Sequence, residues 1–247
     1  MTPPRNHDGA IHKLAREARF IFAGSVEVER SSSLSFLPAG PSTAVVRVER
    51  ILHAPAALHN QSGQQVTVLF HDDLPRSEVG ARRVFFTEPI LYGETIGVRA
   101  LDSIEAPDDL EGLQKQVRGA VDEMKEDELR KHLESAETVL LGRVTEVRPA
   151  SEVPPLQASE HDPDWGVAVV QASRVLKGGK KGGFVVRFPR SRDIHWYRVP
   201  KLKEKQEGLF ILHRDGLEAG RATLALLHPD DFLETGAEEI PRISELL

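Results

Sequence analysis

The chain has 247 residues, of which 40% are apolar and 28% charged, and its formal net charge is −6. This apolar content excludes a wholly disordered chain, and the length allows a sizeable core without a disulfide or metal staple. No cysteine is present, which excludes disulfides, thiol nucleophiles and thiolate metal sites and is typical of a reducing compartment. No apolar stretch reaches the roughly 18 residues of a membrane helix, and residues 1–24 lack the apolar core of a secretory signal. We therefore expect a cytoplasmic protein that does not bind membranes.

The most informative feature is an internal repeat. Residues 20–30 read FIFAGSVEVER, and residues 138–148 read TVLLGRVTEVR. In each segment an apolar run meets a glycine, Gly24 or Gly142, and apolar residues then alternate with polar ones. This pattern predicts a β-strand that bends or bulges at the glycine. A glycine in a simple turn is the alternative, but its recurrence in both segments favours the bend.

After each of these first segments, four more β-rich segments recur in the same order, so that the chain contains two copies of a five-segment pattern. They are 44–54 with 168–178, 64–70 with 182–188, 80–88 with 206–214, and 95–101 with 221–227. Recurrence of five segments in one order indicates a duplication. Five short, twisted strands close most readily into a small barrel, and the five-stranded Greek-key barrel is the OB-fold, whereas a β-sandwich usually needs about seven strands per domain. We predict a mainly β protein built from two tandem five-stranded OB-like barrels.

An acidic, helix-prone stretch at 107–137 separates the two copies. Its apolar residues recur at spacings of three and four and form one stripe: Leu110, Leu113, Val117, Val121 and Met124. We predict a helix here and a second helix at 127–135, packed on the second barrel or at the domain junction. The predicted organisation is a first barrel with a short N-terminal helix over 1–106, this helical linker, and a second barrel over 138–247.

The two copies also share a pattern of glycines and hydrophobic residues. FAGSVEVE is followed by VERILHA in the first copy, and LLGRVTEV by SRVLKGG in the second. This pattern resembles the OB-folds of netrin-like domains and tissue inhibitors of metalloproteinases. The resemblance implies an OB-fold and a protein-binding role. Those inhibitors act through an N-terminal cysteine that chelates a protease zinc ion, and their barrels carry disulfides. Because this chain has no cysteine, the inhibitory chemistry does not carry over to any residue.

Positive charge is concentrated in the second copy. Between Arg174 and Lys205 there are eleven Lys and Arg against two acidic residues, which gives +9, and the rest of the chain sums to −15. Such segregation creates a local positive potential, and aromatic residues are interleaved with the cations. The candidate partner-binding residues are Arg187, Arg190, Arg192, His195, Trp196, Tyr197, Arg198, Lys201 and Lys203.

Three interpretations of this basic segment stay open. It can contact an acidic protein surface on another protein, on a second copy, or on the acidic linker at 122–128. It can also bind single-stranded nucleic acid, since cations meet phosphates and rings stack on bases. A merely solvated face is the third. The equivalent stretch of the first copy, HDDLPRSEVGARR, is mixed in charge, which weighs against nucleic acid. We predict a protein-binding or adaptor module, with nucleic-acid binding through 187–205 as the alternative.

Metal and enzyme motifs are not found in the sequence. Short His/Asp runs at 71–73, 161–162 and 228–231 lie at predicted strand ends, where Asp and Pro are ordinary turn formers, and no H-E-x-x-H spacing is present. There is no G-x-S-x-G elbow, no G-x-G-x-x-G after a strand, and KGGKKGG at 177–183 departs from the P-loop pattern. We predict no metal site, no cofactor and no enzymatic activity.

Overall fold

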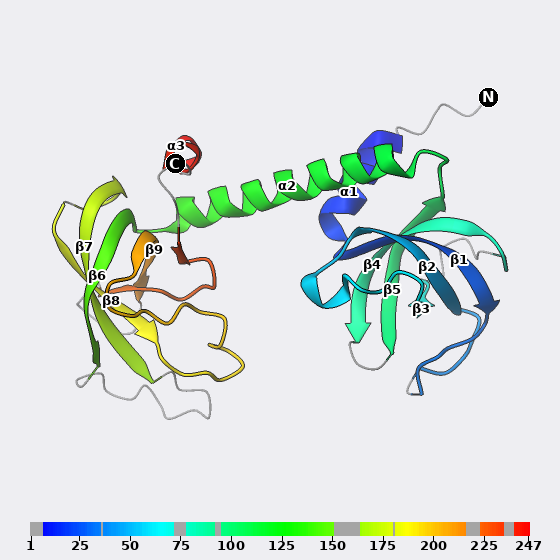
Figure 1. The fold of residues 1–247 in the computed structure, drawn as a ribbon, viewed down its shortest axis with the longest axis horizontal. Coiled ribbons are helices and arrows are strands. Elements are labelled where there is room, and N and C mark those ends of the chain that lie inside the picture. The colour runs from blue at the N-terminus through cyan, green and yellow to red at the C-terminus, as the bar shows by residue number, and fades with distance from the viewer. Residues whose placement is uncertain are drawn as a thin grey trace. The chain divides into compact units, whose positions relative to one another are not determined.

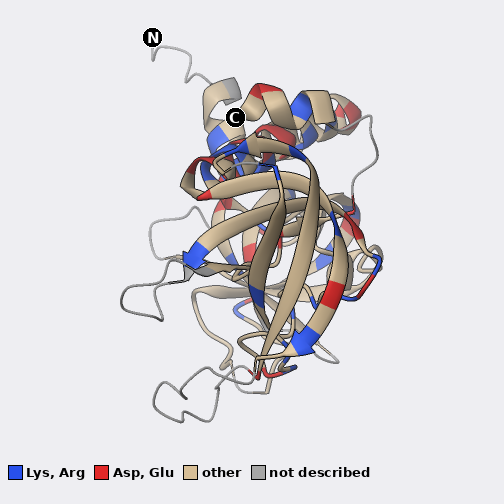
Figure 2. Ribbon diagram, turned by 90° about the vertical axis from the view of Figure 1, so that its left-hand side faces the viewer, with Lys and Arg blue, Asp and Glu red and all other residues tan. Residues whose placement is uncertain are grey.

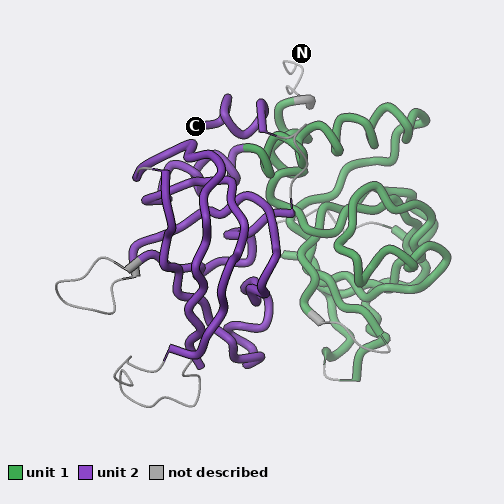
Figure 3. The backbone as a smooth tube through the Cα atoms, turned by 60° about the vertical axis from the view of Figure 1, so that its left-hand side comes forward, with its two compact units in different colours: residues 1–126 green, residues 127–247 purple. Residues whose placement is uncertain are grey.

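The computed structural model describes residues 7–35, 37–71, 78–91, 95–150, 164–179, 181–215, 223–234 and 240–247. The chain divides into two compact units, Met1–Glu126 and Asp127–Leu247 (Figure 3). Among the described residues, no helix has the length and apolar character that crossing a membrane requires.

Unit 1 is a closed five-stranded barrel (Figure 1). Its elements are α1 (His7–Glu17), β1 (Phe20–Glu29), β2 (Thr43–His53), the 3-10 helix η1 (Ala56–Leu58), β3 (Gln65–Leu69), β4 (Arg82–Leu91) and β5 (Ile96–Glu105), followed by α2 (Leu110–Ser135). The strand order is β1-β2-β3-β5-β4, with β3 and β5 parallel and the other described pairings antiparallel. A closed barrel of five strands with this mixture of pairings is OB-like.

Unit 2 repeats this arrangement. Its elements are β6 (Thr138–Pro149), β7 (Trp165–Lys177), β8 (Gly183–Pro189), β9 (Glu207–Asp215), β10 (Thr223–Ala225), β11 (Phe232–Leu233) and α3 (Ile240–Leu246). Strand β10 pairs with β8 in parallel and with β9 antiparallel, so that the ring β6-β7-β8-β10-β9 closes, and β11 adds to β9 outside the ring. The predicted fold class of two five-stranded OB-like barrels is confirmed.

The two barrels also share their irregularities. The β1–β2 ladder shifts register at Ile21/Phe22, Ala23/Gly24 and Val26/Val28, and the β6–β7 ladder shifts at Val139/Leu140, Leu141/Gly142 and Val144/Glu146. Each shift in the second ladder lies 118 residues after its counterpart in the first. A bulge falls at each glycine, which confirms that these glycines mark bends within a strand rather than simple turns.

One of the predicted segment pairings is wrong by a single residue. Thr87 lies opposite Phe20, and Leu212 lies opposite Thr138, which is the counterpart of Phe20. Strand β9 therefore follows β4 by 125 residues, whereas pairing 80–88 with 206–214 implies one residue more.

The first strand of unit 1 is apolar on both faces because it has an apolar neighbour on each side. Phe20 and Phe22 point into the barrel, where the Phe22 ring stacks on that of Phe85 at 5.2 Å between centroids. Ile21 and Ala23 face outward and pack under α1 and α2. In the ribbon of Figure 2, long stretches of strand carry no charged residue, in keeping with strands that are buried along much of their length.

The predicted apolar stripe of α2 is confirmed, since Leu110, Leu113, Val117 and Val121 are buried against the first barrel and Met124 is partly buried there. The prediction of two helices is wrong, because α2 runs unbroken from Leu110 to Ser135. Residues 120–135 contain no glycine or proline and consist mostly of strong helix formers. Near its end, Leu133 packs against β6 and β9 of unit 2 together with α3.

Candidate functional site

Residues 190–205 of the predicted basic segment lie in the connection between β8 and β9, and this connection is anchored to the second barrel. Val199 and Leu202 are buried in the barrel core, and the half-buried Trp196 ring packs against Trp165 at 5.8 Å between centroids. The backbone N–H groups of Trp196 and Tyr197 both donate to the Asp193 carbonyl oxygen, at 2.9 and 2.8 Å. The connection is therefore held by packing and turns although it contains no helix.

Three of the nine predicted residues hold this framework together. Arg187 on β8 is only 5% exposed, and its guanidinium carbon lies 5.8 Å from the centroid of the Trp165 ring. Lys201 donates from Nζ to the Trp196 carbonyl oxygen at 2.7 Å, and burial lowers the pKa of its ammonium group. Together with Trp196, these side chains hold the connection in place rather than lining its exposed surface. Placing Arg187 on an exposed face is corrected, because its side chain is buried beside Trp165 on the face of β8 opposite to the core residues Val186 and Phe188.

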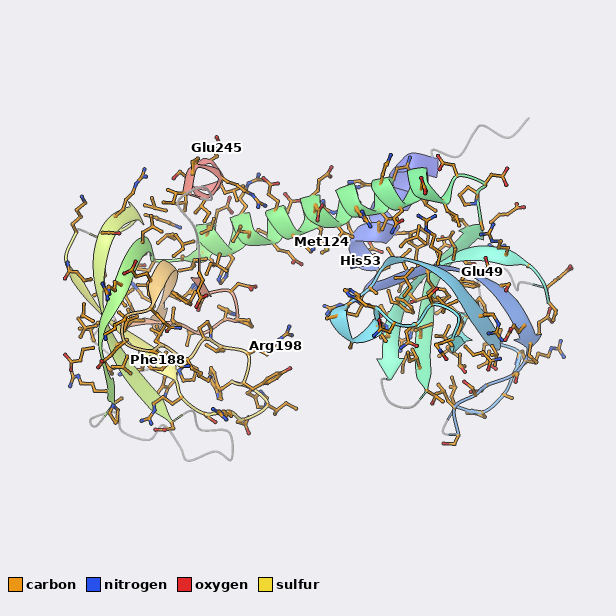
Figure 4. All side chains as sticks on the ribbon, viewed as in Figure 1. Glu49, His53, Met124, Phe188, Arg198 and Glu245 are labelled. Atoms are coloured by element: carbon orange, nitrogen blue, oxygen red, sulfur yellow. The ribbon has the colours of Figure 1, made fainter. Side chains whose placement is uncertain are left out.

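The other six predicted residues are exposed on the connection, and the structure adds one that sequence reasoning missed. The exposed predicted residues are Arg190, Arg192, His195, Tyr197, Arg198 and Lys203. The addition is Ile194, which is 75% exposed and lies three residues before Tyr197, itself 60% exposed. Figure 4 shows Phe188 within the second barrel and Arg198 on the connection, directed away from that barrel. We call Ile194, Tyr197 and the four exposed arginine and lysine residues the basic–apolar face.

A second polar cluster in unit 2 joins residues that the sequence analysis did not connect. Asp231 is fully buried, and its Oδ1 lies 2.7 Å from Nε2 of His132 and 3.1 Å from Nε2 of His213. His132 comes from the last turn of α2, His213 from β9, and Asp231 from the turn before β11. The side chains of His132 and His213 are 18% and 11% exposed.

The other oxygen of Asp231 is held by the backbone. Its Oδ2 accepts from the N–H groups of Leu227 and His228. Burial raises the pKa of Asp231, but hydrogen bonds from His132, His213 and these two amides outweigh it and lower the pKa to about 2. The His228 ring lies edge-on to the rings of His132 and His213, with centroids 5.2 Å from each. Asp231 is thus a fixed carboxylate that contacts two imidazoles, and a third imidazole lies beside those two.

Of the three His/Asp runs predicted to lie in turns, only one lies wholly within the described residues. The run at 228–231 does form the predicted turn, with the Asp231 N–H donating to the His228 carbonyl oxygen at 3.2 Å. The run at 161–162 lies outside the described residues, as does most of 71–73. No spacing rule would have found His132 and His213, because they lie 99 and 18 residues from Asp231 in the chain.

Comparison with known proteins does not assign the chain to a family. No family model matches the chain, and no curated protein matches it. Among solved structures, the chain is similar to the single-stranded DNA binding protein from Thermus aquaticus at 13% identity, over 85% of this chain and 92% of that one, with a TM-score of 0.21. A TM-score this low carries no argument, so the OB-like assignment rests on the strand order and closure of the two barrels.

Proposed function

We propose that this protein is a non-enzymatic binding module whose second barrel recognises an acidic surface on another protein through the basic–apolar face. The observation that carries the proposal is the exposure of Ile194 and Tyr197, at 75% and 60%, between exposed arginines. Large apolar side chains this exposed are costly to keep in water unless a partner covers them.

The composition of the face fits a protein interface. Tyrosine and arginine are enriched among the residues that contribute most to protein–protein affinity, and apolar anchors lie at the centre of such interfaces. Ile194 and Tyr197 supply the anchors, and the three exposed arginines and Lys203 of the same connection supply positive charge that favours an acidic partner. The resemblance to netrin-like domains supports the same class of function.

The anchoring of the connection adds to this argument. Trp196, Val199 and Leu202 pack into the barrel, so the exposed side chains between them start from a fixed backbone. A surface that is already ordered loses less conformational entropy on binding, which leaves more of the contact energy as affinity.

Single-stranded nucleic acid is the second candidate, and the same side chains argue against it. Binding without sequence preference relies on aromatic rings on which successive bases stack. The Trp196 ring is already packed on Trp165, which leaves Tyr197 as the strongly exposed large ring of the face. An aliphatic side chain such as Ile194 offers a base no stacking surface.

Site-specific photocrosslinking from the full chain tests the proposal. A photoreactive residue replaces Tyr197, and a matched control carries it at Val185, which is 53% exposed on β8 of the same unit. We expect one acidic protein to crosslink from position 197 and not from position 185, and to be lost when Arg192 and Arg198 are both changed to Glu. Crosslinks to nucleic acid or to a second copy of the chain, or equal crosslinking from both positions, would overturn the proposal.

A further inference from the structure

We propose that His132, His213 and Asp231 form a binding site for a divalent transition-metal ion, with Zn²⁺ the best match. The three side chains come from a helix, a strand and a turn of unit 2, and one ligand atom from each lies within 4.8 Å of the others. This inference is independent of the basic–apolar face and of its partner.

The spacing of the ligand atoms is close to that of an occupied site. Zinc bonds to histidine nitrogen and carboxylate oxygen are about 2.0–2.1 Å long, which places neighbouring ligands of a tetrahedral ion about 3.3 Å apart. Here Oδ1 of Asp231 lies 2.7 Å from Nε2 of His132 and 3.1 Å from Nε2 of His213. Small side-chain rotations therefore suffice to admit an ion in place of the imidazole protons.

The carboxylate is supported as metal ligands usually are. Ligating carboxylates are themselves hydrogen-bonded, and these outer contacts orient the free oxygen toward the metal. Oδ2 of Asp231 accepts two backbone N–H groups, and the Asp231 carbonyl oxygen accepts the N–H of Ile211 at 2.8 Å. The backbone and the carboxylate of Asp231 are therefore both held in place, and Oδ1 is the oxygen that faces the histidines.

The donor set selects the class of ion. Two imidazole nitrogens with one carboxylate suit Zn²⁺ and its neighbours Co²⁺, Ni²⁺ and Cu²⁺, whereas Ca²⁺ and Mg²⁺ require mostly oxygen ligands. Partial exposure of His132 and His213 gives an ion a route from solvent. The exposed His228 ring lies beside both, which makes it the nearest further imidazole for a fourth position.

An occupied site would link the end of α2 to the barrel of unit 2, since His132 lies on the helix and His213 and Asp231 lie on the sheet and its turn. Binding to the folded state alone raises its stability by mass action. The alternative is a hydrogen-bonded His–Asp cluster that holds no ion. The two differ in one respect, because only a metal site makes the stability of unit 2 depend on added Zn²⁺ and on chelators.

The first experiment uses the untagged full chain, stripped with a chelator and titrated with ZnCl₂ alone. We expect one equivalent of bound Zn²⁺ by elemental analysis, a higher melting temperature that a chelator reverses, and a tetrahedral visible spectrum when Co²⁺ replaces Zn²⁺. No stoichiometric binding, or binding without a change in melting temperature, would overturn the site. This measurement needs no variant, so it does not depend on how a substitution folds.

Variants then place the ion. His132→Gln and His213→Gln each remove one ligand, and His59→Gln removes an exposed imidazole of unit 1 as a matched control. We expect each ligand variant to bind Zn²⁺ at least about tenfold more weakly, because losing even a residue that only hydrogen-bonds to a ligand costs about tenfold or more in metal affinity. The control should bind Zn²⁺ as the parent does. Unchanged affinity in both ligand variants, with circular dichroism showing a folded chain, would overturn the assignment.

Discussion

Gly24 and Gly142 occupy the same point in their two barrels, and neither has room for a side chain. A Cβ atom on Gly24 would collide with the carbonyl oxygen of Arg47, and one on Gly142 would lie 2.8 Å from the carbonyl oxygen of Gln171. Each glycine directly follows a register shift in the first strand of its barrel. Close approach of the neighbouring backbone at the bulge therefore explains why both copies carry a glycine at this position.

Replacing Gly24 with Ala is expected to destabilise unit 1. The new methyl group meets backbone rather than a flexible side chain, and overpacking of this kind costs about 1–3 kcal/mol in the free energy of unfolding. Gly119→Ala is the control, because a Cβ there meets nothing within 4 Å and lies in α2, where alanine is favoured by about 1 kcal/mol. Denaturant unfolding should show changes of opposite sign. A neutral Gly24→Ala variant would contradict the close packing at the bulge.

Replacing Arg187 is expected to destabilise unit 2, whereas replacing Arg192 is not. Arg187→Ala removes a buried side chain and its cation–π contact with Trp165, so we expect a loss of about 1–3 kcal/mol in the unfolding free energy of unit 2. Arg192→Ala alters an exposed residue and should change stability by less than about 0.5 kcal/mol. Tryptophan fluorescence follows the unfolding. Equal stabilities of the two variants would show that the Arg187 contact does not support the connection.

His53 is expected to make the stability of unit 1 depend on pH. Burial lowers the pKa of His53 from 6.5, the charges of Lys125 and His59 lower it further, and Asp122 opposes them. Because the unfolded chain binds this proton more tightly, the contribution of His53 is fully present above pH 6.5 and is lost as pH falls through 6.5 toward the lower folded pKa.

The corresponding experiment compares the parent with His53→Gln, which has no titrating group at this position. Unfolding free energies are measured from about pH 8 down to about pH 5, the range in which a histidine changes charge. We expect the parent to lose stability faster than the variant as the pH falls. Parallel curves for the two proteins would contradict the assigned shift, since other histidines titrate equally in both.

The fold was largely predictable because the hydrophobic pattern of the sequence repeats. The alignment of β4 with its counterpart β9 was not predicted correctly. Val84, Phe85 and Phe86 are all fully buried, and so are their counterparts Leu209, Phe210 and Ile211. When both faces of a strand are buried, alternation between apolar and polar residues disappears and no longer fixes the register. The one-residue error in pairing β4 with β9 arises at this point.

The candidate sites were predictable to different degrees. Charge density along the chain located the basic segment, because charge is a local property of the sequence. It did not show that Arg187 is buried, which depends on the packing of Trp165 over β8, nor that Ile194 faces solvent. The His132–His213–Asp231 cluster has no local signal, because packing of α2 near β9 brings its members together.

The affinity of the crosslinked partner for two variants measures how much Ile194 and Tyr197 contribute to binding. Binding of the purified partner is measured by titration with the parent chain, with an Ile194→Ser/Tyr197→Ser double variant, and with Val185→Ser as the control on the same unit. If the basic–apolar face is the interface, the double variant loses about 2 kcal/mol or more, roughly 30-fold in Kd, and the control binds as the parent does. An unchanged Kd for a folded double variant would show that the partner binds elsewhere on the protein.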